Sequence, residues 1–96
     1  MEDKNLIQSV ERTFEVISVL SSCNEGISLT QLSNTVKLHK ATVGRILKTL
    51  KSLNIVSQNS DSLKYSLGNG FLELSLNYLE NLDLKKIALP EMRLLQ

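Results

Sequence analysis

Residues 39–53, HKATVGRILKTLKSL, decide the fold because the two faces of this stretch differ in chemical character. Apolar side chains recur at steps of three and four, which places them on one side of an α-helix. They are Val43, Ile46, Leu47, Leu50 and Leu53. The opposite face is small near the helix start and basic or polar further on: Ala41, Gly44, Arg45, Lys48 and Ser52. We therefore predict an amphipathic helix whose outer face can approach a polyanion closely.

The charge is unevenly distributed along the chain, although the formal net charge is only +1. Residues 26–60 contain no Asp or Glu and hold five basic side chains: Lys37, Lys40, Arg45, Lys48 and Lys51. Residues 1–25 have two basic and five acidic side chains, and residues 65–96 have three and four. A basic patch between acidic flanks is typical of nucleic-acid contact. The alternative for such a run is an ordinary solvated helix face.

The length and composition indicate one small globular domain. The chain has 96 residues and a single cysteine, Cys23, which excludes an internal disulfide and suits a small buried side chain. We find no signal peptide and no apolar run of 18 residues, so the sequence predicts a cytoplasmic protein without a membrane partner.

The first predicted helix begins after Ser9, a good N-cap residue, and runs to about Cys23. Its main apolar stripe consists of Val10, Phe14, Ile17 and Leu20, and Val16, Val19 and Cys23 widen it. This apolar arc is wider than one packed neighbour needs, which predicts a second contact surface. Gly26 follows, where a left-handed backbone is often required.

Two further helices are predicted to form a helix-turn-helix unit. Ser28 and Gln31 have the spacing of a capping box, which starts a short helix running to about Lys37 with Leu32 and Val36 facing inward. The basic helix follows directly. Thr30 and Gln31 lie near the amino end of the first of the pair, where a phosphate can be bound.

The next segment predicts a β-hairpin beside the helices. Residues 55–58 begin an extended stretch after Asn54, residues 59–62 favour a turn, and residues 63–67 alternate apolar with polar side chains. Three helices followed by a two-stranded wing make a mainly α winged helix-turn-helix, in which the second helix of the pair enters the major groove.

Four motifs together resemble the amino-terminal DNA-binding domain of the IclR family of bacterial transcription regulators. They are QSVERTFEVISVL (8–20), ISLTQLSNTVKL (27–38), KATVGRILKTL (40–50) and KYSLGNGFLEL (64–74), and they span almost the whole chain. Each motif is weak alone, whereas the combination is specific. The resemblance implies a dimeric, operator-binding regulator whose full-length form has a carboxy-terminal domain that senses a small-molecule effector. We expect that domain to be missing from this chain.

The sequence departs from the family pattern at three places. Gly44 stands where relatives usually have a side chain that can reach a base or phosphate. Glycine inside a helix costs about 1 kcal/mol relative to alanine, so either close approach of DNA or evolutionary drift explains it. Gln58 and Ser66 replace residues that are often basic, which leaves Lys64 as the wing cation, and Leu63 replaces a common turn glycine.

Residues 71–82 predict a linker helix that is apolar on two sides. One side can face its own domain, and the other needs a partner, which the resemblance identifies as a second copy of the chain. Helical spacing continues from Asp83 past Pro90 to Gln96. We therefore divide the chain into residues 1–70, the winged helix-turn-helix domain, and residues 71–96, the linker helix with the start of the missing effector domain.

Enzymatic activity finds little support, because one His, one Cys and no clustered acids form neither a nucleophile-base pair nor a metal site. His39 serves as a helix-start residue or as a DNA contact. Gly68 and Gly70 form a turn rather than a phosphate loop, since the third glycine of the dinucleotide motif is Glu73. We predict no cofactor. The alternative function is a winged helix that mediates protein interaction or dimerisation without DNA.

The predicted DNA-binding residues come from both helices of the pair and from the wing. They are Thr30, Gln31, His39, Lys40, Ala41, Thr42, Gly44, Arg45, Lys48, Lys51 and Lys64. Arg45 is the candidate base reader, and Lys48, Lys51 and Lys64 mainly hold phosphates. The predicted dimer contacts are Val16, Val19, Leu72, Leu76 and Leu79. A two-fold dimer implies a near-palindromic double-stranded operator.

Overall fold

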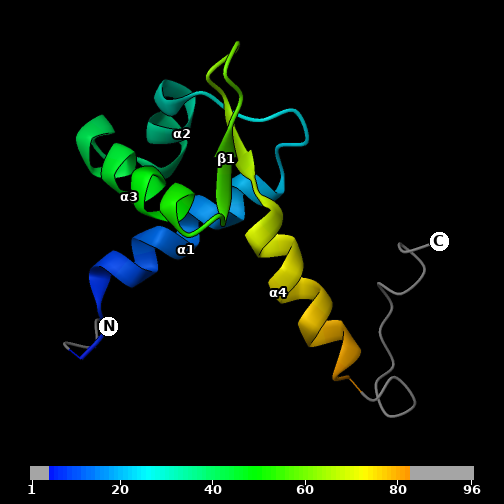
Figure 1. The fold of residues 1–96 in the computed structure, drawn as a ribbon. Coiled ribbons are helices and arrows are strands. Elements are labelled where there is room, and N and C mark those ends of the chain that lie inside the picture. Colours follow the sequence, from blue (N-terminus) through cyan, green and yellow to red (C-terminus); the bar gives the residue numbers. More distant parts are fainter. Residues whose placement is uncertain (1–4, 83–96) are drawn as a thin grey trace.

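The computed structural model describes residues 5–82, and their fold is a three-helix core with a two-stranded wing and a projecting fourth helix (Figure 1). The elements are α1 (Gln8–Ser21), α2 (Leu29–Val36), α3 (Lys40–Ser52), β1 (Val56–Gln58), β2 (Tyr65–Leu67) and α4 (Asn69–Glu80). This order confirms the predicted winged helix-turn-helix. The helical run expected from Asp83 onward lies outside the described residues.

The core lies where α1, α2 and α3 meet β1. Its buried side chains are Val16, Leu20, Ile27, Leu32, Val43, Leu47, Leu50 and Val56. The inward stripe predicted for α3 is confirmed at Val43, Leu47 and Leu50, while Ile46 is half-buried at its edge. Leu53 was expected inward, but it is 62% exposed. The reason is that α3 ends at Ser52 and the chain turns at Asn54, whose φ is 66°.

Three expectations about α1 are corrected by the structure. The helix starts at Gln8 with Ile7 as its N-cap, so Ser9 is not the cap; its carbonyl accepts a hydrogen bond from Thr13 Oγ1 at 2.7 Å. Val10 and Phe14 were expected inward but are 62% and 68% exposed. The helix also ends at Ser21, before Cys23, so Gly26, with φ of 87°, belongs to the following loop.

The capping box at the start of α2 is confirmed. The backbone N–H of Gln31 donates to Ser28 Oγ at 3.1 Å, and the backbone N–H of Ser28 donates to Gln31 Oε1 at 3.4 Å. At the other end Lys37 is left-handed with φ of 60°, and the N–H of Leu38 donates to the Ser33 carbonyl. This turn swings the chain directly into α3.

The wing is a short antiparallel hairpin, as predicted, with Val56 opposite Leu67 and Gln58 opposite Tyr65. A single bridge between Ile27 and Tyr65 joins the loop before α2 to this sheet. In the turn, Asn59 Oδ1 accepts hydrogen bonds from the backbone N–H groups of Asp61 and Ser62, both at 2.8 Å. Leu63 takes the positive φ, 63°, that a glycine would adopt more easily.

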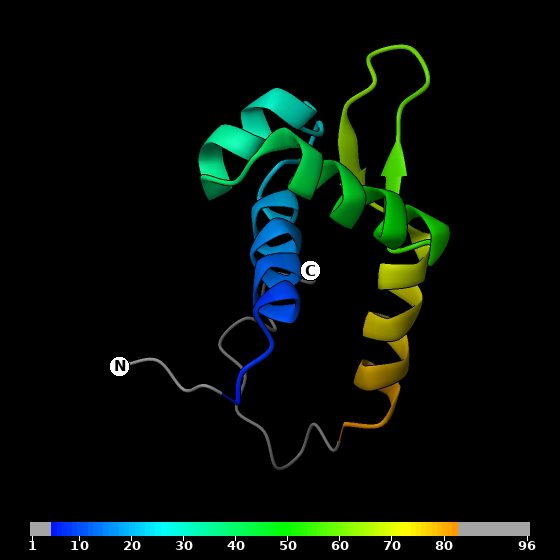
Figure 2. The ribbon, with the colours of Figure 1, turned by 90° about the vertical axis from the view of Figure 1, so that its left-hand side faces the viewer.

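Helix α4 docks on the domain through its first turn. The N–H of Gly70 donates to the Asn54 carbonyl at 2.8 Å, and the N–H of Gly68 donates to the Ile55 carbonyl at 2.7 Å. Gly70 therefore lies inside the helix rather than in a turn, and α4 begins two residues earlier than expected. No residue of α4 is fully buried. Figure 2 shows α1 and α4 extending on the side of α3 opposite to the hairpin tip.

Candidate nucleic-acid interface

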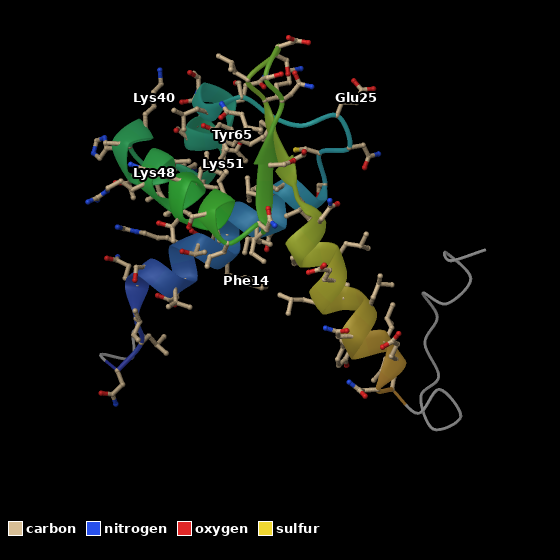
Figure 3. All side chains as sticks on the ribbon, in the orientation of Figure 1. Phe14, Glu25, Lys40, Lys48, Lys51 and Tyr65 are labelled. Atoms are coloured by element: carbon tan, nitrogen blue, oxygen red, sulfur yellow. The ribbon has the colours of Figure 1, made fainter. Side chains whose placement is uncertain are left out.

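The outer face of α3 forms the candidate interface. Lys40, Ala41, Arg45 and Lys48 are exposed along it, and Gly44 and Thr42 flank it half-exposed. Figure 3 shows Lys40 and Lys48 on the side of α3 that faces away from α4. Within residues 5–82, no carboxylate pairs with these cations. The positive charge of this face is therefore directed to solvent, where it can attract a polyanion.

The start of α3 leaves His39 available. His39 is the N-cap residue of α3, yet its side chain makes no capping hydrogen bond and is exposed. Its place as a helix-start residue is confirmed, and its contact with DNA stays a prediction. Of the two α2 residues, Gln31 uses its backbone N–H and its Oε1 in the capping box, whereas Thr30 is exposed beside it. Thr30 is thus the better placed of the pair for a phosphate.

Lys51 points toward the wing rather than outward. Its Nζ donates to Gln58 Oε1 at 3.1 Å, and Gln58 Nε2 in turn donates to the Leu63 carbonyl at 3.1 Å. The ammonium group thereby links the end of α3 to the turn of the hairpin. A phosphate contact by Lys51 would have to share or break this link, whereas Lys64, exposed at the base of the turn, has no such competing side-chain bond among the described residues.

Gly44 has open space around it. A Cβ built on Gly44 meets no atom within 4 Å, so packing within the chain does not require a glycine here. We expect Gly44→Ala to raise the free energy of unfolding by about 0.5–1 kcal/mol, because alanine is the better helix former. If DNA approaches this backbone closely, the same variant should bind operator DNA about tenfold more weakly. Thermal melting and anisotropy titration of the one variant measure both effects, and unchanged or tighter DNA binding would identify the glycine as drift.

One residue near the interface was missed from the sequence. Arg12 on α1 is half-buried and borders an open hollow together with Thr42 and Arg45 of α3. Its neighbours Glu11 and Glu15 made this part of the chain seem acidic, and only the crossing of the helices shows that Arg12 lies beside α3.

The expected dimer contacts fall into two groups. Leu72, Leu76 and Leu79 are exposed on α4, in agreement with a surface that is free to bind a partner. Val16 is fully buried in the core of its own chain, so its place in a dimer contact was wrong. Val19 is half-buried and borders a shallow groove with Phe14 and Val36. The exposed apolar residue of α1 beside this groove is therefore Phe14 (Figure 3).

The arrangement of α2, α3 and the hairpin agrees with the comparison to known proteins. The model of the IclR helix-turn-helix domain matches residues 9–60. The chain belongs to the IclR family. It is 40% identical over 87 residues to the transcriptional regulator KdgR of Dickeya chrysanthemi, covering 91% of this chain and 28% of that protein. The glycerol operon regulatory protein of Streptomyces coelicolor is 32% identical over 83 residues, covering 86% of this chain and 33% of that protein.

A solved IclR structure shows the same fold. The IclR family transcriptional regulator from Brucella abortus superposes with a TM-score of 0.77 at 28% sequence identity, covering 99% of this chain and 36% of that one. This IclR chain thus spans about a third of the length of the relatives that it matches. These relatives are named as transcription regulators, not as enzymes.

Residues 5–82 contain neither a membrane-spanning helix nor a cluster of metal ligands. No helix there combines the length and apolar character needed to cross a bilayer. No group of three or more His, Cys, Asp or Glu side chains comes together there in a way that could hold a metal ion.

Proposed function

We propose that this IclR-family chain is a cytoplasmic, non-catalytic module that binds double-stranded DNA sequence-specifically and regulates transcription. The observation that supports it best is the outer face of α3, where exposed Lys40, Arg45 and Lys48 have no acidic partner among the described residues. An α-helix fits the major groove of B-DNA, where every base pair shows a distinct pattern of donors and acceptors. In this proposal α3 enters that groove, and Thr30, His39, Lys48 and Lys64 position it on the phosphates.

Selection of bound sites from random duplex DNA tests the proposal. We expect one enriched motif, and the affinity for it should fall steeply between 50 and 200 mM salt because phosphate contacts release counterions. A matched duplex with the selected site scrambled serves as the control for non-specific binding. Absence of any enriched motif, or affinity that does not depend on salt, would favour the protein-interaction module instead.

We also propose that the chain binds its operator as a two-fold dimer through α4 and the exposed part of α1. Exposed leucines at helical spacing on one face of α4 support this: Leu72, Leu76 and Leu79. Contiguous apolar surface of this kind is rare on monomers and costs about 25 cal/mol per Å² left in water. Figure 2 shows that α1 and α4 extend to the same side of the domain, away from the wing. A dimer formed there leaves the outer face of α3 free in each protomer, so that the two protomers can bind two half-sites.

Leu76→Asp should weaken this dimer by at least tenfold, because it buries an unpaired carboxylate in the contact. Asn77→Asp is the matched control, since it adds the same charge at the adjacent exposed position. Sedimentation equilibrium at micromolar concentration measures both variants. Equal association of the two variants, or a wild-type chain that is monomeric at these concentrations, would contradict the proposed contact.

We further propose that residues 71–96 connect the DNA-binding domain to a carboxy-terminal domain that binds a small-molecule effector. The length of the relatives supports this proposal, since the regulators compared above extend over about three times the matched region.

A further inference from the structure

Arg12 lies at the meeting point of two open hollows on the same side of the domain. The first lies between α1 and α3 and is bordered by Arg12, Thr42 and Arg45. The second opens beside the turn from α2 to α3 and is bordered by Arg12, Lys37 and His39. Arg12 and Thr42 border both, so the two hollows adjoin at these residues, and we name the pair the α1 cradle.

The α1 cradle is positively charged. Arg12, Lys37 and Arg45 contribute permanent positive charges to its wall, and no Asp or Glu in the described part of the chain lines either hollow. Arg12 pairs with no carboxylate within residues 5–82. The guanidinium of Arg12 is therefore accessible to solvent and open to an anionic ligand, and its planar fork of donors matches a phosphate or carboxylate.

The position of the α1 cradle selects the kind of anion. Arg45, the candidate base reader, borders the same hollow as Arg12, so DNA with its groove against α3 would bring a strand backbone past the cradle. We propose that Arg12, assisted by Lys37, holds one DNA backbone phosphate there and extends the DNA interface from α3 onto α1. This inference rests on the proposed DNA binding of α3 and adds a contact that is independent of base sequence.

A purely structural role for Arg12 makes different predictions. Its aliphatic stem can cover the apolar edge of α3 near Ile46, and in that case only the packing of the stem matters. Arg12→Met keeps a stem of similar length and removes the charge, while Arg12→Lys keeps the charge. Glu15→Gln is the matched control on α1. Glu15 borders the groove beside Phe14 and not the α1 cradle, and its substitution also changes the charge of the helix by one unit.

The test is a salt series with the 96-residue chain and the duplex enriched by selection from random DNA. We expect Arg12→Met to bind about tenfold more weakly at low salt and to reduce the slope of log affinity against log salt by about 0.9 per bound protomer, the value for one lost phosphate. Arg12→Lys should restore most of the slope, and Glu15→Gln should leave it unchanged.

A second arm locates the phosphate. A series of duplexes places a single neutral methylphosphonate at each successive backbone position. At one position we expect it to lower the affinity of the wild-type chain and to leave the affinity of Arg12→Met unchanged. The inference would be overturned if Arg12→Met kept the wild-type salt slope. It would also be overturned if every methylphosphonate lowered the affinity of Arg12→Met by the same factor as that of the wild-type chain. A wild-type chain that binds no duplex would instead overturn the proposed function, and this is visible before any Arg12 variant is compared.

Discussion

Arg45→Ala is expected to abolish most of the preference of this chain for its operator over scrambled DNA. Arg45 is exposed one turn into α3, and an arginine fork that pairs bidentately with guanine contributes about 1–3 kcal/mol of discrimination. The ratio of the two affinities should therefore fall by roughly 5- to 150-fold. Anisotropy titrations with the selected and the scrambled duplex, at one fixed salt concentration, measure this ratio.

Lys48→Ala is the matched comparison for Arg45→Ala, because Lys48 is exposed on the same face of α3. A lysine that holds a phosphate should weaken binding to both duplexes about equally and leave their ratio unchanged. We choose Lys48 rather than Lys51 because the hydrogen bond of Lys51 to Gln58 means that its removal also loosens the wing. If Arg45→Ala and Lys48→Ala reduce both affinities by the same factor, Arg45 does not read a base.

Local patterns predicted most of the fold. The spacing of Val43, Leu47 and Leu50 determines which side of α3 is buried, and the pair Ser28 and Gln31 places the start of α2. Both patterns depend on residues within one or two helical turns, so they are visible in the sequence. The turn formers at residues 59–62 likewise placed the hairpin.

The errors arose where distant segments decide the outcome. The apolar periodicity of α1 includes Phe14, but the buried part of the helix begins only at Val16. Periodicity cannot show how far a neighbouring element reaches along a helix. The end of α2 near Lys37 was predicted correctly, but the left-handed backbone of Lys37 was not, because a Gly or Asn usually takes that position. The place of Arg12 beside Arg45 depends on the crossing of α1 and α3, which is also a tertiary property.

The two glycines inside helices have opposite structural reasons, although the sequence alone treats them alike. Gly44 faces open space, whereas a Cβ on Gly70 would lie 2.6 Å from the Asn54 carbonyl oxygen and 2.9 Å from its carbonyl carbon. Those atoms belong to the backbone turn that ends α3, and Asn54 already holds a positive φ there. The turn therefore has little freedom to move away from an added methyl group.

Gly70→Ala is consequently expected to lower the free energy of unfolding by about 3 kcal/mol, at the upper end of overpacking costs. For a domain of this size the melting temperature should fall by roughly 10–20 °C. The clash also strains the hydrogen bond from the Gly70 N–H to the Asn54 carbonyl, which satisfies a first-turn donor of α4 and fixes the helix to the end of α3. Differential scanning calorimetry measures the stability, and amide hydrogen exchange of residues 69–80 shows whether α4 has separated from the domain.

Asn69→Ala is the matched control, because Asn69 is exposed between Gly68 and Gly70 at the start of the same helix. It should change the melting temperature by only a few degrees, since surface substitutions are usually within about 0.5 kcal/mol. Helix propensity alone predicts that Gly70→Ala stabilises the chain by up to about 1 kcal/mol, as expected for Gly44→Ala. A rise in melting temperature for Gly70→Ala would therefore show that the close approach of Asn54 does not restrict this position, and that α4 is not held to α3 by their shared turn.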